Sequence, residues 1–313
     1  MSSVKYISCA SGWFASYFVR SDGSVDRYVK GKVVQRLVPP QGVQYTQASA
    51  GTTASFLLRS DGAVDRIVGK QAEIDGTMAP EVKGKSFLNL FSGSIKYVAV
   101  SASGGPTYLM RSDGKVDLAR SGEVVETMES GPYQEVSGGS DFSLLLKADG
   151  SIDRIFAFGK IGHTFPPSPA TYTKISNQYI SEPQDIFASG APSHFYFIRA
   201  DGKVDRVSIK SNTIGSTMDP PAGTKYVYIS SYEGATYLLR SDGVVDRTTG
   251  GGKIANSMSP PPGVQYTLVA AGEYATYLVR SDGMIDRTKG SGKVSETISP
   301  EVVPDPSGGC SVM

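Results

Sequence analysis

The sequence predicts an all-β fold, a seven-bladed β-propeller whose blades each contain four strands. The first observation is an eight-residue segment, RSDGVVDR at 240–247, whose pattern occurs seven times in the 313-residue chain. The second is the spacing of these copies, which is close to 40 residues with two longer intervals. The third is a run of β-branched and aromatic residues before each Asp-Gly pair. Four short strands recurring at this period are typical of a propeller blade.

The repeats are aligned on the basic residue that precedes each Asp-Gly pair: Arg20, Arg59, Arg111, Lys147, Arg199, Arg240 and Arg280. In six copies a tyrosine stands 14 residues earlier, at Tyr6, Tyr45, Tyr97, Tyr133, Tyr226 and Tyr266. In the fifth copy Asp185 occupies that position. Because the repeats run through the whole chain, we expect one domain over residues 1–300 and a flexible tail over 301–313.

Each repeat contains four segments with the composition of short strands. Residues 44–50 are an example of the first strand, 235–241 of the second and 244–248 of the third, and the fourth leads to an apolar residue and prolines. Between the second and third strands, Asp-Gly supplies the positive backbone angles of a tight hairpin. These turns are centred at positions 22, 61, 113, 149, 201, 242 and 282.

Two insertions lengthen the repeats, near 82–93 and 166–183. In a four-stranded blade, the loops after the first and third strands lie on one face of the disc, and the Asp-Gly turns lie on the other. We expect both insertions to connect a fourth strand to the next first strand, and therefore to lie on the Asp-Gly face. Long loops in compact domains are often functional.

Composition narrows the classes of partner. A formal net charge of +1 lacks the basic field that nucleic acid or an anionic membrane would require, so we expect no nucleic-acid partner. Only Cys9 and Cys310 occur, which favours a reducing compartment and a cytoplasmic location. We expect a monomer that binds another protein.

Charged residues recur with the turns. Each copy has an aspartate four residues after the turn aspartate: Asp26, Asp65, Asp117, Asp153, Asp205, Asp246 and Asp286. Six copies add an arginine, at Arg27, Arg66, Arg154, Arg206, Arg247 and Arg287, while Leu118 is the exception. We interpret these charges as ion pairs that hold the blades, because a repeated feature serves repeated packing. A charged rim that binds a ligand is the alternative. If the ring is partly exposed, Leu118→Arg should be nearly neutral.

The sequence offers little for catalysis. His163 and His194 stand far apart, outside any metal-ligand spacing, and the Asp-Gly segments lack the distal glutamate of a calcium loop. We therefore expect no enzyme activity, no metal and no cofactor. An enzyme with a site in the central tunnel remains an alternative. It would require a polar cluster there that departs from the sevenfold repeat, and ring-like ion pairs alone would remove it.

The segment AAGEYATYLVRSDGMI at 270–285 resembles the repeat of the regulator of chromosome condensation family. The resemblance covers residues 5–300 and implies a seven-bladed propeller. It also implies a protein-binding disc, with nucleotide exchange on a small GTPase as an alternative function. Two features differ from the family repeat. Alanine replaces its histidine in several copies, as at Ala15 and Ala54, and Asp-Arg replaces the aromatic-Gly that ends the third strand.

Binding by one face requires features that break the symmetry. The loops between first and second strands vary in sequence and carry aromatic or imidazole side chains, and such residues on a rigid scaffold are typical interface anchors. The candidate partner-binding residues are Trp13, Phe14, Phe142, His194, Tyr232 and Tyr274. The alternative for each is that it caps the apolar end of its own blade.

The chain ends in Cys310-Ser-Val-Met, which matches the C-a-a-X form with the terminal methionine of farnesylated proteins. Ser311 is not aliphatic, and no polybasic patch precedes the motif. The sequence thus predicts lipidation at Cys310. One prenyl chain gives reversible attachment, so we expect movement between cytoplasm and membrane.

Overall fold

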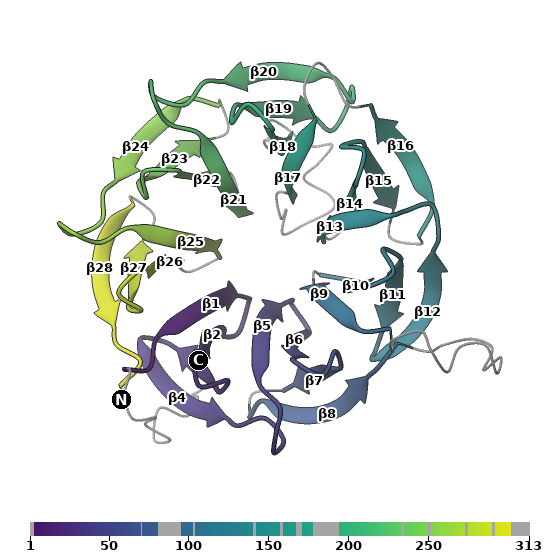
Figure 1. The fold of residues 1–313 in the computed structure, drawn as a ribbon, viewed down its shortest axis with the longest axis vertical. Helices are drawn as coiled ribbons and strands as arrows, with labels where there is room; N and C mark the ends of the chain where they lie inside the picture. The colour runs from purple at the N-terminus through teal and green to yellow at the C-terminus, as the bar shows by residue number, and fades with distance from the viewer. Residues whose placement is uncertain are drawn as a thin grey trace, which may run out of the picture.

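A computed structural model confirms the seven-bladed all-β propeller (Figure 1). The structure describes residues 3–69, 71–80, 95–102, 104–139, 142–156, 159–166, 171–177, 194–232, 235–249, 252–272, 275–289 and 292–301. Every regular element in these ranges is a β-strand. The same ranges contain no helix that is long and apolar enough to cross a membrane.

The strands follow one another blade by blade. Blade 1 comprises β1 (Tyr6–Ser11), β2 (Ser16–Arg20), β3 (Val25–Val29) and β4 (Lys32–Leu37). Blade 2 comprises β5 (Tyr45–Ala50), β6 (Ala54–Arg59), β7 (Val64–Val68) and β8 (Glu73–Met78). Blade 3 comprises β9 (Tyr97–Ala102), β10 (Thr107–Arg111), β11 (Val116–Arg120) and β12 (Glu123–Met128). Blade 4 comprises β13 (Tyr133–Ser137), β14 (Phe142–Lys147), β15 (Ile152–Phe156) and β16 (Ile161–Phe165).

The remaining three blades have the same composition. Blade 5 comprises β17 (Tyr172–Asn177), β18 (His194–Arg199), β19 (Val204–Ser208) and β20 (Ile214–Met218). Blade 6 comprises β21 (Tyr226–Tyr232), β22 (Ala235–Arg240), β23 (Val245–Thr249) and β24 (Ile254–Met258). Blade 7 comprises β25 (Tyr266–Ala271), β26 (Thr276–Arg280), β27 (Ile285–Lys289) and β28 (Lys293–Ile298).

Each blade is an antiparallel sheet in sequence order, so the blades coincide with the sequence repeats, and within the described ranges no strand is exchanged between the termini. The first strands surround the axis of the ring and the fourth strands form its outer edge (Figure 1). The turn glycines have the positive φ that the hairpin prediction requires. At Gly243, for example, φ is 82°. A residue with a β-branched side chain would be destabilised by this backbone conformation.

Apolar clusters fill the spaces between neighbouring blades. One of them joins Leu118 of blade 3 to Leu145 and Ile155 of blade 4, next to the ring of Tyr108. Leu118 is 1% exposed. The condition under which an arginine would be tolerated there, a partly exposed ring, is therefore not met, because this position is part of an apolar core.

The recurring aspartates form a buried ring, which confirms their structural interpretation. Each is at most 2% exposed and accepts a hydrogen bond of 2.8–3.0 Å from the hydroxyl of its own blade's first tyrosine. In blades 2 to 7 the other carboxylate oxygen accepts a bond from a hydroxyl of the fourth strand, and in blade 1 Arg36 takes that place. Burial, then the bonded carboxylate, raises the pKa of tyrosines such as Tyr45 and Tyr266, which keeps them protonated as donors.

Blade 5 corrects the sequence alignment. Its first tyrosine is Tyr172, whose hydroxyl donates to Asp205 at 2.9 Å, and Asp185 lies outside the described residues. Since β17 ends at Asn177 and β18 begins at His194, the extra residues stand between the first and second strands. The end of β17 and the start of β18 lie on the face opposite the Asp-Gly turns, contrary to the place predicted for this insertion. The insertion near 82–93 follows β8 and precedes β9, as expected.

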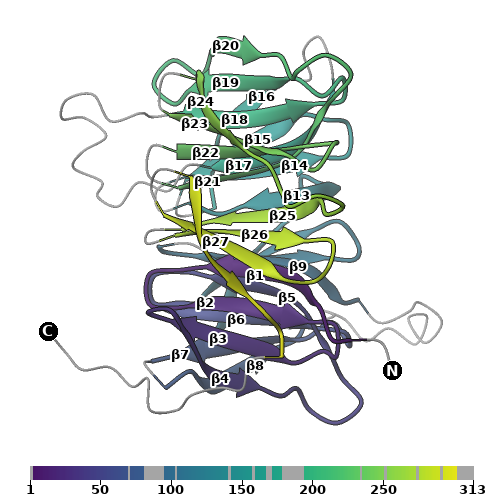
Figure 2. The same ribbon diagram turned by 90° about the vertical axis from the view of Figure 1, so that its left-hand side faces the viewer.

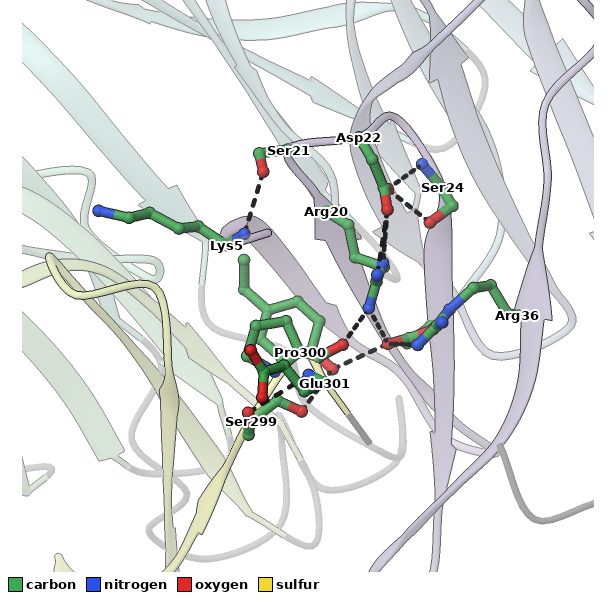
Figure 3. A network of polar contacts seen from close by, with 11 residues as sticks. Lys5, Arg20, Ser21, Asp22, Ser24, Arg36, Ser299, Pro300 and Glu301 are labelled. Carbon is green, nitrogen blue, oxygen red and sulfur yellow. Dashed lines mark hydrogen bonds and ion pairs between the residues drawn. The ribbon is translucent and has the colours of Figure 1, made fainter. Parts of the chain in front are cut away.

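The ring closes by the contact that joins the other blades. At six of the seven blade junctions the carbonyl of a turn glycine accepts a hydrogen bond from the N–H of the next blade's first tyrosine, and at the closure Gly283 of blade 7 accepts one of 2.9 Å from that of Tyr6. The segment after β28 adds contacts (Figure 3): Arg20 donates to the carbonyl of Pro300 and also pairs with Asp22 at 3.0 Å. Hydrogen bonds and packing thus replace the exchanged strand that other closures use.

Candidate interaction face

We call the side that carries the loops after the first and third strands the loop face, and the side with the Asp-Gly turns the turn face. Figure 2 shows the disc from its edge, with connections on both faces. The turn face repeats the same Arg–Asp pairs from blade to blade, such as Arg199–Asp201 at 2.9 Å and Arg111–Asp113 at 2.7 Å. The loop face lacks this regularity, and the candidate binding residues that differ from blade to blade lie there.

The loop between β1 and β2 presents two aromatic side chains. The N–H of Gly12 donates to the carbonyl of Ala15 at 3.1 Å, which closes a tight loop. A Cβ added to Gly12 would lie 2.7 Å from the Cβ of Ala50 in blade 2, so only glycine allows this close packing. Trp13 is 37% exposed and Phe14 is 62% exposed. A short loop packed on the neighbouring blade thus holds both rings toward solvent.

A cleft of about 130 Å³ lies on the axis at the loop face. Trp13 and Tyr232 are its large lining residues, and small residues line the remainder, including Ser11, Ala102 and Gly138. These residues come from six of the seven blades, which places the cleft at the ends of the first strands. Trp13 and Tyr232 are far apart in sequence, but the ring brings them to one opening.

Phe142 has a packing role within blade 4. It is half-buried, and its ring centroid is 5.4 Å from that of Phe156 in an edge-to-face arrangement. The guanidinium of Arg154 lies 3.9 Å from the centre of the Phe142 ring. These contacts are those of a side chain that caps the end of its own blade.

His194 begins β18 and is half-buried. Its Nδ1 is 3.1 Å from Nη2 of Arg206, and because arginine can only donate, Nδ1 is the acceptor. Burial, and then the charge of Arg206, lowers the pKa of His194. The residue is therefore a neutral imidazole at pH 7 that orients an arginine.

Two candidates lie outside the described residues: Tyr274, on the loop between β25 and β26, and Cys310 in the tail. The predicted insertion at 82–93 also lies outside them, as do residues 167–170 and 178–183 of the insertion predicted at 166–183.

A set of functional candidates that the sequence analysis missed lies around the axis. The second residue after the first-strand tyrosine is different in every blade: Ser8, Gln47, Ala99, Glu135, Lys174, Tyr228 and Leu268. Where their contacts are defined, these side chains reach the neighbouring first strand. Gln47 thus exchanges two hydrogen bonds of 3.3 and 3.2 Å with the backbone of Val100. The available signal was the variation itself, at one position in an otherwise uniform repeat.

Glu135, Lys174 and Tyr228 are the ionisable residues of this set. Lys174 Nζ is 3.7 Å from Glu135 Oε2, longer than a hydrogen bond, and Oε2 is buried without a hydrogen-bond partner. Burial raises the pKa of Glu135 to about 7, against the opposing effect of Lys174. Burial also raises the pKa of Tyr228. The axis therefore carries more than ring-like ion pairs, and the structure does not remove the enzymatic alternative.

Within the described ranges, no group of three or more His, Cys, Asp or Glu side chains is arranged to hold a metal ion. His163 contacts the ring of Phe165 at a centroid distance of 4.6 Å, and His194 contacts Arg206. The two histidines thus belong to separate packing environments.

Comparison with known proteins identifies the fold. No protein-family model matches the chain, and no curated protein matches it. Among solved structures, human WBSCR16 is similar with a TM-score of 0.60 and 13% identity, over 88% of this chain and 86% of that one. Yeast RCC1 (Prp20), solved bound to Kap60, is similar with a TM-score of 0.57 and 12% identity, over 82% of this chain and 75% of that one. The chain therefore has the propeller fold of these RCC1-like structures.

Proposed function

We propose that the protein is a non-enzymatic interaction scaffold that binds another protein through its loop face. The observation that carries this proposal is the exposed pair Trp13 and Phe14, held by a loop that is packed against blade 2. Aromatic side chains on a rigid scaffold lose little conformational freedom on binding, and aromatic residues are enriched among binding hot spots.

Further observations support the loop face as the surface that binds the partner. The axial cleft next to Trp13 gives a partner side chain a concave place to enter. The turn face, in contrast, uses its charges internally, as in the pairs Arg59–Asp61 and Arg280–Asp282. Yeast RCC1, a propeller of similar fold, is known in a complex with another protein, Kap60. The likeness supports a protein partner for this chain without identifying it.

The test is affinity capture of the full chain from an extract of its source cells, followed by mass spectrometry. The variants are wild type, the double variant Trp13→Ala/Phe14→Ala, and the control Val38→Ala. Val38 is 73% exposed and follows β4, which places it on the turn face. We expect proteins enriched by wild type and by the control to be lost from the double variant. Equal enrichment by all three proteins would contradict the proposal.

The identity of the captured partner also distinguishes a scaffold function from nucleotide exchange. A small GTPase is the partner class that the sequence resemblance implies. If a GTPase is captured, release of labelled GDP is measured with and without the propeller. Faster release would replace the scaffold function with nucleotide exchange, and unchanged release would support the scaffold.

A further inference from the structure

A second cleft on the loop face lies between blades 1 and 2, with a volume of about 160 Å³. Its principal lining residues are Phe14, Tyr17 and Arg27 of blade 1 and Thr53, Ser55 and Ile67 of blade 2. Phe14 is therefore both an exposed anchor and one wall of this cleft. Apolar and aromatic groups form most of the wall, and hydroxyls are added by blade 2.

Arg27 is the charged residue of this cleft. It lies on β3, is 7% exposed, and its Nε is buried without a hydrogen-bond partner. Among the described residues, no acceptor bonds its guanidinium and no carboxylate lies within ion-pair distance. A buried cation that is not paired is costly, and its charge attracts an anion into the cleft.

Four of the five corresponding arginines of other blades have partners, which sets Arg27 apart from most of the repeats. Arg66 pairs with Asp75, and Arg154 donates to the carbonyl of Ile209 at 3.1 Å and to Oδ1 of Asn212 at 2.7 Å. Arg247 also has no partner within the described residues, but it is only half-buried and lines neither cleft.

The difference between Arg154 and Arg27 lies in the neighbouring blade. The hairpin that receives Arg154 connects β19 to β20 and supplies Ile209 and Asn212. The hairpin that faces Arg27 connects β7 to β8 and is one residue shorter. Of this hairpin, Gly69 lines the cleft and has no side chain that could accept a bond.

We propose that this cleft binds a carboxylate side chain, Glu or Asp, of the protein partner. A planar guanidinium binds a carboxylate through two parallel hydrogen bonds. The cleft is smaller than the roughly 300–1,000 Å³ that small-molecule ligands occupy, and so fits a side chain better than a nucleotide. The site rests on the proposed function, because it places an acidic residue of the partner beside the Phe14 anchor.

The probe is the blocked tripeptide acetyl-Gly-Glu-Gly-amide, compared with acetyl-Gly-Gln-Gly-amide and with the phosphoserine tripeptide. Binding to the ¹⁵N-labelled full chain is followed by amide chemical shifts. We expect the Glu peptide to bind with a dissociation constant in the roughly millimolar range, typical of a single charged contact. Its shifts should map to residues 51–55 and Gly69, and the Gln peptide should cause none.

Variants then assign the effect to Arg27. Arg27→Met keeps a chain of similar length without the charge, and should abolish the Glu-peptide shifts. Arg66→Met, which alters the corresponding arginine of blade 2, should retain them. If Arg27→Met does not fold, the wild-type shift map decides. The proposal is overturned if the Glu peptide gives no shifts, gives shifts at other residues, or if only the phosphoserine peptide binds. None of these results depends on the capture experiment, so the two proposals fail separately.

Discussion

The aspartate ring and the axis positions are two rings of the same seven repeats with opposite patterns. The aspartate ring has the same residue type in all seven blades. Each aspartate is buried and accepts a hydrogen bond from the first tyrosine of its own blade. The axis positions use seven residue types, from Ser8 to Leu268, at one place in the first strand. Positions that make the same packing contacts in every blade thus keep one residue type. Positions without this packing constraint differ from blade to blade and make the propeller asymmetric.

The largest expected effect is at the uniform ring. Asp205→Ala removes the acceptor of Tyr172 and of Thr217, which lie at 2.9 and 2.6 Å, and leaves the buried Tyr172 without its hydrogen-bond acceptor. Breaking a buried charged network of this kind costs about 3–5 kcal/mol. Urea unfolding measures the change. Asp201→Ala, at an exposed turn aspartate, is the control and should cost about 1 kcal/mol or less.

A comparable loss on both aspartate substitutions would show that the turn face, and not the buried ring, holds blade 5 together. The two residues belong to one blade and both pair with Arg199. The experiment thus isolates burial as the variable.

Leu118→Arg tests the one departure from the arginine pattern. The side chain would enter the cluster of Tyr108, Leu145 and Ile155, where an unpaired charge costs about 3 kcal/mol. Leu118→Met conserves volume and should cost less than about 1.5 kcal/mol. Thermal or urea unfolding of the two variants separates the effect of the charge from the effect of side-chain shape. A neutral Leu118→Arg would mean that blade 3 opens easily, and would restore the expectation from the repeat alone.

The fold was predictable because its determinants repeat. Asp-Gly turns, strand patterning and a period near 40 residues identify seven blades, and the structure confirms them. Blade 5 departs from the repeat spacing, which places the first tyrosine of the other blades 14 residues before the basic residue of the turn. Tyr172 lies farther away, and only its hydrogen bond to Asp205 identifies it.

The candidate site was less predictable, for a physical reason. Trp13 and Phe14 could be located because loop positions follow from the strand order. The isolation of Arg27 could not be predicted, because six blades carry the same arginine and the difference lies in the partner across a blade interface. Asn212 meets Arg154, whereas Gly69 lies at the cleft of Arg27. Such pairings depend on the length and path of hairpins, which a repeat alignment does not show.

The axis positions predict a pH dependence of stability. The folded-state pKa of Glu135 is raised by burial to about 7 from the ordinary value of 4.5, so the folded state binds the proton more tightly than the unfolded state. This contribution to stability is fully present below about pH 4.5 and is lost as pH rises through 7. Its size is on the order of 2 kcal/mol. Glu135→Gln should remove it, so urea unfolding at pH 5 and pH 8 should differ less for the variant than for wild type.

A control on the turn face keeps this test specific. Asp201→Ala leaves Glu135 and Lys174 in place and should retain the wild-type difference between pH 5 and pH 8. If Glu135→Gln also retains it, the carboxyl of Glu135 is ionised in the folded protein and the axis is not the source of the pH dependence.

The smallest expected effect is at a third ring of positions, which varies more than the aspartate ring and less than the axis positions. The fourth residue after the first tyrosine is serine in blades 2 to 6 and alanine in blades 1 and 7. Ser49 accepts a hydrogen bond of 2.8 Å from the N–H of Ala102, and Ser230 one of 2.9 Å from that of Ala271. These bonds satisfy the inner edge of the next blade's first strand, where no further strand pairs.

Ser49→Ala should therefore cost about 1 kcal/mol, because the N–H of Ala102 loses its acceptor. Amide hydrogen exchange provides the local measurement: the protection of Ala102 should fall while that of Ala271 remains, since Ala271 is bonded by Ser230. Equal protection in variant and wild type would mean that water replaces the hydroxyl at the axis. The inner edges would then be solvated, and the axis positions would be free to vary because they face water and not because they bind a partner.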